Sequence, residues 1–236
     1  MNRIVISGYY GFGNAGDEAM LAAILEAILE VVPNADITVI SGNPKVTAER
    51  HGIKAVGRFD GLGILSAIAR CDLLISGGGS LLQDVTSKRS LYYYLSIITL
   101  AQWFGKRIML YAQGIGPLRS ERARKTVGRV LNKVTMITVR DEKSRHELEA
   151  MGVTKVPIQV TADAVLAMHP VDTTIGKRLL APYQLSGVKK RIGVSVRQWK
   201  QSTSYRKELA TALDTLQETL DVDVVFIPMQ HPADTA

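Results

Sequence analysis

The stretch Ile4-Val5-Ile6-Ser7-Gly8-Tyr9-Tyr10-Gly11-Phe12-Gly13-Asn14-Ala15-Gly16-Asp17-Glu18-Ala19-Met20-Leu21 decides how this chain folds. It begins with an apolar run typical of a buried strand, continues as a glycine-rich turn and ends in an amphipathic helix. Gly11, Gly13 and Gly16 fit the spacing G-x-G-x-x-G, and glycine lets a backbone adopt positive φ angles and approach a ligand closely. A helix start offers free N–H groups and a positive dipole end, so the stretch predicts a phosphate or carboxylate site.

Two carboxylates, Asp17 and Glu18, lie at the start of that predicted helix. A carboxylate at this position can simply cap the helix. It can equally transfer protons beside a bound anion, because the helix dipole lowers its proton affinity while the anion raises it. The sequence leaves both interpretations open.

Strand-like and helix-like runs alternate along the chain, which predicts an α/β fold with a parallel sheet and helices on both faces. The expected strands are Arg3–Gly8, Asp36–Ser41, Asp72–Ser76, Arg107–Gln113 and Met136–Arg140, then Arg191–Val196 and Asp223–Pro228. The expected helices are Asp17–Val32, Leu62–Arg70, Leu91–Phe104, Glu121–Val134, Glu142–Met151 and Tyr205–Leu220.

This alternation predicts two Rossmann-like domains. Residues 1–170 would form the N-terminal domain, residues 171–190 a linker, and residues 191–236 the start of a truncated C-terminal domain. The second domain is expected to be incomplete because a single β-α-β unit cannot bury both faces of its sheet.

Glycine and polar residues follow several of the expected strands. These segments are Gly77–Asp84, Gln113–Pro117 and Arg140–Ser144. Because ligands bind outside the carboxyl ends of parallel strands, the site is expected at this edge. Arg140 could grip a ligand anion or form a surface salt bridge with Asp141 or Glu142.

Two further residues occupy similar positions in the second half. Arg197 follows a strand as Arg140 does, and His231 follows the last strand. The candidate catalytic residues are Asp17 and Arg140. The candidate substrate-binding residues are Gly11, Gly13, Asn14, Gly16, Gly78, Gly79, Ser80, Gln113, Gly114, Arg197 and His231.

The motifs argue against several other ligands. A dinucleotide fold needs an acid after its second strand, where this chain has Ser41-Gly42-Asn43. No metal-ligand spacing, nucleophile elbow or phosphate-binding Walker loop is present, so neither a metal nor a cofactor is expected. Nucleic acid is not an expected partner, because no reader motif appears and no aromatic residues interleave with the basic ones.

Composition adds three expectations. The single cysteine, Cys71, predicts a buried thiol and a reducing, cytoplasmic compartment. The uncharged stretch Ser90–Gly105 is shorter than a membrane span and predicts a buried helix. The net charge is +7, and the basic amphipathic segment from Arg119 to Lys133 is either a solvated face or a surface for an anionic membrane or polyanion.

The glycine stretch resembles the opening motif of the polysaccharide pyruvyl transferase family, and looks closest to its CsaB-type branch. Three later blocks, Gly77–Asp84, Ala112–Pro117 and Val139–Ser144, are similar to further blocks of that family. The resemblance implies two facing Rossmann-like domains of GT-B type. It also implies pyruvyl transfer from phosphoenolpyruvate to two hydroxyls of a cell-wall sugar, as in S-layer anchoring, with release of phosphate.

The resemblance also implies roles for residues. Asp17 matches the family's acidic residue at the helix start, and Arg140 matches an arginine placed to hold the donor. The family's Arg-Leu-His block and a later lysine would lie beyond Ala236. A lipid-linked polysaccharide precursor at the inner membrane face is an expected acceptor. Two other functions remain open: a GT-B glycosyltransferase using a nucleotide sugar, and a non-catalytic module that binds sugar or membrane.

Overall fold

The computed structural model describes residues 2–85, 87–183, 185, 189–196 and 204–230. The chain divides into two compact units: Met1–Phe12 with Gly16–Met168, and Gly13–Ala15 with His169–Ala236. Each unit is an α/β structure built on a parallel sheet, which confirms the predicted fold class.

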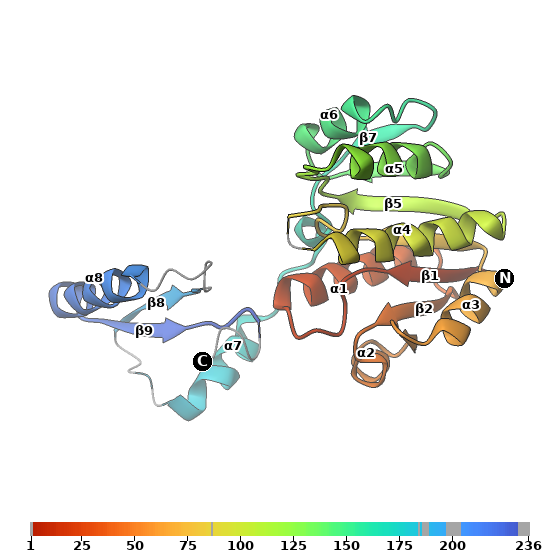
Figure 1. Ribbon diagram of the computed structural model, residues 1–236. Helices are drawn as coiled ribbons and strands as arrows, with labels where there is room; N and C mark the ends of the chain where they lie inside the picture. The colour runs from red at the N-terminus through yellow and green to blue at the C-terminus, as the bar shows by residue number, and fades with distance from the viewer. Residues whose placement is uncertain (1, 86, 184, 186–188, 197–203, 231–236) are drawn as a thin grey trace. The chain divides into compact units, whose positions relative to one another are not determined.

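The first unit contains a seven-stranded parallel sheet (Figure 1). The strand order is β3-β2-β1-β4-β5-β6-β7, so the chain winds outward from β1 in both directions. The strands are β1 (Arg3–Ser7), β2 (Asp36–Ser41), β3 (Lys54–Gly57), β4 (Leu73–Gly77), β5 (Arg107–Gln113), β6 (Met136–Val139) and β7 (Ile158–Val160).

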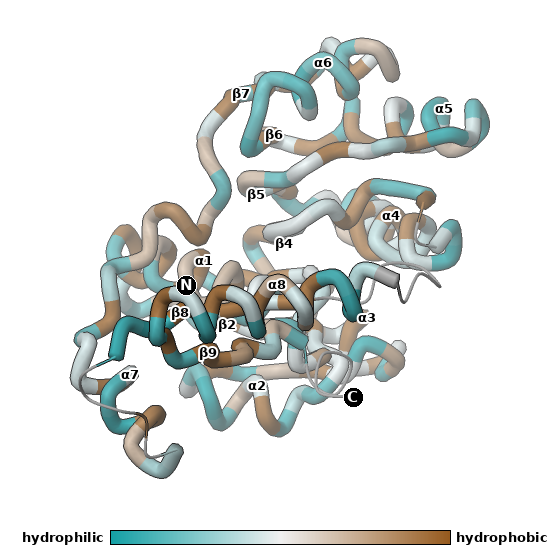
Figure 2. The backbone as a smooth tube through the Cα atoms, turned by 90° about the vertical axis from the view of Figure 1, so that its left-hand side faces the viewer, coloured by the Kyte–Doolittle hydropathy of each residue, from teal (hydrophilic) through white to brown (hydrophobic). Residues whose placement is uncertain are grey.

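The helices of this unit are α1 (Ala15–Val31), α2 (Pro44–His51), α3 (Gly61–Arg70), α4 (Lys88–Trp103), α5 (Glu121–Leu131) and α6 (Glu142–Ala150), with a 3₁₀ turn η1 (Ala164–Ala167). These helices cover both faces of the sheet. Successive residues of a strand point to opposite faces, so each central strand packs against helices on both sides. Val5 packs into the cluster formed with α3, α4, α5 and α6, whereas Ile4 and Ile6 pack against α1. Brown, which marks hydrophobic residues in Figure 2, is found along the strands between these helices.

Three elements of the first unit differ from the sequence expectation. The strands β3 and β7 and the helix α2 were not predicted, although the structure contains them. The strands have only four and three residues, and neither is fully buried, so neither shows the long apolar run by which a central strand is recognised. Helix α2 begins at Pro44 and buries only Thr47, so it lacks a strong apolar stripe.

The predicted strand over residues 107–113 is present, but its end is irregular. The pairing of β5 with β6 shifts between Leu110 and Gln113, and the buried Ala112 adopts a φ of 48°. The Ala112 N–H donates to the Thr138 hydroxyl at 2.7 Å, and that hydroxyl donates to the Leu110 carbonyl at 3.2 Å. This β-bulge turns the chain at the point where the polar segment Gln113–Pro117 begins.

Two expectations about buried segments are confirmed. Cys71 is 2% exposed, and its thiol donates to the Ile68 carbonyl. Helix α4 contains most of the uncharged stretch and buries one face in the core. Among the helices that the structure describes, none is both long enough and apolar enough to cross a membrane.

The second unit contains the parallel pair β8 (Lys190–Val194) and β9 (Val222–Phe226), with α8 (Ser204–Leu220) between them in sequence. The helix α7 (Thr173–Leu180) and the turn η2 (Ala181–Tyr183) precede this pair. Helix α7 lies within residues 171–190, which the sequence predicts to be a mixture of helix and linker.

Candidate functional site

The glycine turn after β1 is held against the end of β2. Gly11 and Gly13 have φ angles of 78° and 69°, a region that other residues rarely adopt. A side chain on Gly11 would also overlap the Ser41 hydroxyl and the Asn43 N–H, so this position requires glycine for space as well as for conformation.

Glu18 fixes this turn from the helix side. Its carboxylate accepts a hydrogen bond from the Gly11 N–H at 2.7 Å and lies 3.8 Å from the Arg50 guanidinium. Glu18 therefore holds the glycine turn in place through its side chain.

Asp17 lies over a different loop. Its Oδ1 is 3.5 Å from the position that a Cβ on Gly79 would occupy. The Gly79 N–H donates to the Met20 sulfur at 2.9 Å, one turn further along α1. Helix α1 thus packs its first turn directly on the backbone of Gly78-Gly79, and both of these glycines have positive φ angles.

Tyr10 supports the same loop from below. Its hydroxyl is buried and donates to the Gly77 carbonyl at 2.7 Å. Burial, and secondarily the negative charge of Asp17, raise the pKa of the Tyr10 phenol far above its ordinary value. Tyr10 is therefore a neutral structural donor that fixes the end of β4.

Arg140 is the central cation of the site. It follows β6 and donates to the Ser80 hydroxyl at 3.2 Å and to Asp163 Oδ2 at 3.2 Å, while its Nε lies 3.6 Å from Asp141. Gly114 lies beneath it, since a Cβ there would stand 2.7 Å from the Arg140 Nε. Arg140 thereby joins segments that follow β4, β5, β6 and β7.

A pocket of about 230 Å³ opens beside Arg140. Its lining residues come from three loops and the start of α6, and they are Ser80, Gly114, Ile115, Gly116, Pro117, Arg140, Asp141, Lys143, Ser144 and Glu147. Two cations, Arg140 and Lys143, line it together with two carboxylates, Asp141 and Glu147, and with serine hydroxyls and glycine backbone. Such a lining suits a small polar ligand better than an apolar one, and an anionic group of that ligand would bind at the two cations.

The first turn of α6 forms one wall of this pocket. Asp141 caps the helix by accepting from the Ser144 N–H at 2.7 Å, and hydrogen bonds from the Ser144 side chain and backbone lower the pKa of Asp141. The Ser144 hydroxyl in turn accepts from the Ile115 N–H at 3.0 Å. The helix start and the segment after β5 are therefore fixed to each other.

The segments after β4 and β5 run side by side. The Gly114 N–H donates to the Gly79 carbonyl at 3.0 Å, and the Gly116 N–H donates to the Leu82 carbonyl at 2.9 Å. Asp84 accepts from the N–H groups of Arg119 and Ser120, and these bonds lower its pKa. The polar loops at this edge are thus rigidly connected.

Gln113 lies beneath the pocket. Its side chain is fully buried, and its Nε2 donates to the carbonyl and hydroxyl of Ser76 at 3.2 and 3.0 Å. Gln113 therefore fixes the ends of β4 and β5 to each other.

The edge of β2 is covered by aromatic groups. The Phe12 ring lies against Gly42, stacks on Tyr9 with ring centroids 4.2 Å apart, and lies 5.1 Å from the Arg58 guanidinium. A dinucleotide fold places a ribose-binding acid at this strand end. Here an aromatic ring occupies the corresponding surface.

The structure brings most of the predicted residues of the first unit to one edge. Asp17, Gly79, Ser80, Gly114 and Arg140 form a continuous arrangement. Gly11 and Gly78 lie in the supporting turns, and Gly16 is the second residue of α1. Gly13 and Asn14 group with the second unit. Arg197 and His231 lie outside the described residues.

Sequence reasoning missed Asp163, Lys143 and Tyr10. Asp163 comes three residues after β7, and that strand was too short to be recognised. Lys143 stood inside a quoted block, but only the helical geometry places it on the pocket wall. Tyr10 was visible as an insertion in the glycine turn, although its buried hydrogen bond has no sequence signal.

Solved structures with the same architecture define the class of fold. UDP-GlcNAc 2-epimerase from Methanocaldococcus jannaschii matches with a TM-score of 0.64 and 14% identity, over 100% of this chain and 67% of that one. The S. aureus MnaA–UDP co-structure matches with a TM-score of 0.62 and 14% identity, over 98% of this chain and 63% of that one. The chain therefore has the α/β fold of the GT-B type that the sequence predicted, and it spans about two thirds of the length of these proteins.

The sequence itself identifies the family. The profile of the family described as polysaccharide pyruvyl transferase matches residues 14–234, and the chain belongs to this family. No curated protein sequence matches the chain.

Proposed function

We propose that this protein transfers the pyruvyl group of phosphoenolpyruvate to a sugar of a cell-wall polysaccharide or its lipid-linked precursor. The observation that carries the proposal is the polar pocket lined by the cations Arg140 and Lys143. The loop that contributes Ser80 to this pocket also contains Gly79, which lies beside the carboxylate of Asp17. Membership of the polysaccharide pyruvyl transferase family supports the reaction class.

The pocket offers groups for the two anionic ends of phosphoenolpyruvate. The guanidinium of Arg140 suits bidentate binding of a phosphate or a carboxylate. Lys143 adds a second positive charge, and the N-terminus of α6 adds backbone N–H groups. Asp163 and Ser80 keep the guanidinium in place before the donor binds.

The reaction requires two proton transfers that a carboxylate can serve. One sugar hydroxyl and then a second form C–O bonds to C2 of the enolpyruvyl group, and the C2–O bond to phosphate breaks. Of the two hydroxyl protons that are released, one is matched by a proton added to the methylene carbon, which becomes a methyl group. The other leaves with the phosphate. We assign Asp17 to these proton transfers, because it lies beside Gly79, and the hydroxyl of the next residue, Ser80, accepts a hydrogen bond from Arg140.

The acceptor is proposed to be a lipid-linked sugar chain reached from the cytoplasmic face of the membrane, for a polymer of the kind that anchors a surface layer. The basic helix α5 supports contact with an anionic membrane, since it carries four basic residues and one acidic residue.

Two matched pairs of variants test the assignment. With phosphoenolpyruvate and a sugar acceptor, Asp17→Asn should reduce kcat about 10²- to 10⁴-fold, while Glu18→Gln should retain it. Arg140→Gln should raise KM for phosphoenolpyruvate about 10- to 100-fold, while Arg145→Gln, on an exposed part of α6, should not. Undiminished phosphate release by Asp17→Asn would refute the catalytic role.

A nucleotide-sugar glycosyltransferase is the second candidate. Its support is the likeness of fold to the S. aureus MnaA–UDP co-structure. Calorimetric titration separates the two, because only the true donor should bind tightly and release its group to an acceptor. Binding of a UDP-sugar with turnover, and none of phosphoenolpyruvate, would favour this alternative.

A further inference from the structure

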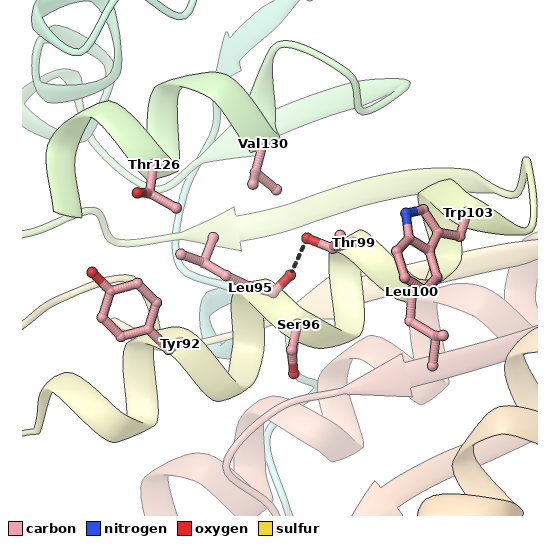
Figure 3. Close-up of a pocket in the computed structure, with 8 residues that line it drawn as sticks. All are labelled: Tyr92, Leu95, Ser96, Thr99, Leu100, Trp103, Thr126 and Val130. Carbon is pink, nitrogen blue, oxygen red and sulfur yellow. Dashed lines mark hydrogen bonds between the residues drawn. The ribbon is translucent and has the colours of Figure 1, made fainter. Parts of the chain in front are cut away.

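A groove runs between α4 and α5, on the outer side of the sheet and away from the residues around Arg140. Its volume is about 410 Å³. Figure 3 shows Thr126 and Val130 of α5 directed toward the side chains of α4. The α4 side is formed by Tyr92, Leu95, Ser96, Thr99, Leu100 and Trp103. The hydroxyls of Ser96 and Thr99 donate to carbonyls of the same helix. The groove is therefore predominantly apolar.

Two aromatic residues mark the ends of this groove. Tyr92 is 45% exposed and Trp103 is 84% exposed, and Figure 3 shows them at opposite ends of α4. They are eleven residues apart, which corresponds to about 16 Å along a helix. Exposed tryptophan and tyrosine beside an apolar groove are typical of side chains at a membrane–water interface.

The same two helices carry most of the excess positive charge of the chain. They contain six basic residues against a single acid, Glu121, which gives a net charge of +5 out of +7 for the whole chain. The hydrophilic colour of α5 beside α4 is visible in Figure 2. Helix α4 itself has no acidic residue.

Three cations beside the groove are available to bind anions. Arg122, Arg129 and Lys133 form no ion pair with any carboxylate that the structure describes, whereas Arg124 and Lys125 pair with Glu147 and Glu121. Arg122 and Arg129 lie on α5, one turn before Thr126 and next to Val130, and Lys133 lies in the turn that follows the helix. All three residues are exposed. An apolar groove is thus bordered by a stripe of uncompensated positive charge.

We propose that the α4–α5 surface docks on an anionic phospholipid bilayer, with Trp103 and Tyr92 at the interface and an acyl chain in the groove. The complementary charge selects this occupant, because each basic residue near such a surface favours binding. A second copy of the chain would bring +5 against +5 and repel. This inference deepens the membrane contact proposed above, and its test is independent of pyruvyl transfer.

The test measures partitioning of the protein onto vesicles of neutral phosphatidylcholine, with and without about one third phosphatidylglycerol. We expect binding to the anionic vesicles that weakens as salt rises. The Asp17→Asn chain should bind as the wild type does, so failure of the proposed catalysis leaves this result unaffected. Equal binding to both vesicle types, or to neither, would overturn the proposal.

Charge reversal provides the matched comparison. The triple variant Arg122→Glu, Arg129→Glu, Lys133→Glu should lose about 100-fold or more in partitioning onto anionic vesicles. The control carries the same change in net charge at exposed positions elsewhere, Lys45→Glu, Arg70→Glu and Lys155→Glu, and should retain most binding. Equal losses in the two variants would show a non-specific charge effect and contradict the proposed surface.

Trp103 supplies a direct spectroscopic readout. With Trp199→Phe, Trp103 is the sole tryptophan, and its emission should shift to the blue and be quenched by brominated lipid on vesicle binding. Trp103→Ala should weaken partitioning about tenfold, whereas Leu62→Ala, an exposed apolar truncation on α3, should not. An unchanged spectrum, or a dimer that shields Trp103 without any vesicle binding, would refute the docking surface.

Discussion

The Arg140 guanidinium donates to the Ser80 hydroxyl at 3.2 Å, directly above the backbone of Gly114. The contact joins the loop after β4 to the end of β6, and it depends on the absence of a side chain at position 114. A Cβ there would stand 2.7 Å from both Ser80 Oγ and Arg140 Nε. The position of the central cation is therefore set by a glycine.

Gly114→Ala tests that dependence. Gly114 has no positive φ, so alanine fits the backbone, but the added methyl group must displace Arg140 or Ser80. We expect KM for phosphoenolpyruvate to rise about tenfold or more, with little change in melting temperature. Gly61→Ala, where a Cβ would meet open space, is the control. A normal KM in Gly114→Ala would argue against Arg140 as the donor-binding cation.

Glu18→Ala should destabilise the protein, but it should not remove a group that takes part in the reaction. The substitution leaves the Gly11 N–H without its 2.7 Å acceptor, and we expect a loss of about 1–3 kcal/mol in unfolding free energy. Urea denaturation measures this loss. Glu30→Ala, an exposed carboxylate on the same helix, should change stability by less than about 0.5 kcal/mol.

Tyr10→Phe should remove a buried hydrogen bond and alter the alkaline stability profile. The lost donor leaves the Gly77 carbonyl unsatisfied, at a cost of about 1–2 kcal/mol. Because folding raises the pKa of Tyr10, its contribution is full below its unfolded pKa of about 10 and declines as pH rises above that value. Melting temperatures recorded between pH 8 and 11 should therefore fall less steeply in Tyr10→Phe than in the wild type. Parallel curves would contradict the buried, neutral phenol.

Asp141 gives the opposite pH dependence. Its folded pKa is lowered, so its charge stabilises the fold above the ordinary value of 3.8, and the contribution is lost as pH falls through the folded pKa. Asp141→Asn retains the cap and should differ from the wild type at neutral pH but not in strong acid. Asp141→Ala also loses the cap on α6 and should cost about 1 kcal/mol more. Denaturant titrations across this pH range provide the measurement.

The central part of the fold was predictable from sequence because its signals are strong. The strands β1, β2, β4 and β5 are apolar runs, and the helices between them repeat apolar residues at helical spacing. The short outer strands β3 and β7 were not predictable, because a half-buried strand of three or four residues resembles a loop.

The location of the site was predictable from the sequence, but the role of each residue in it was only partly so. Strand ends in a parallel sheet share one edge, so Arg140 and the Gly79-Ser80 segment could be placed near each other from sequence alone. The division of roles between Asp17 and Glu18 could not, since both carboxylates stand at the same helix start and only the three-dimensional contacts distinguish them. The pairing of Arg140 with Asp163 depended on the unrecognised strand β7.

The bulge at the end of β5 has a consequence for recognising distant relatives. Ala112 and Thr138 are joined by a hydrogen bond across 26 positions of the chain, and neither lines the pocket. A relative that keeps this bent strand end needs a small residue at the first position and a hydroxyl at the second. The two positions should accordingly vary together, so they would identify this architecture in sequences whose binding residues have diverged.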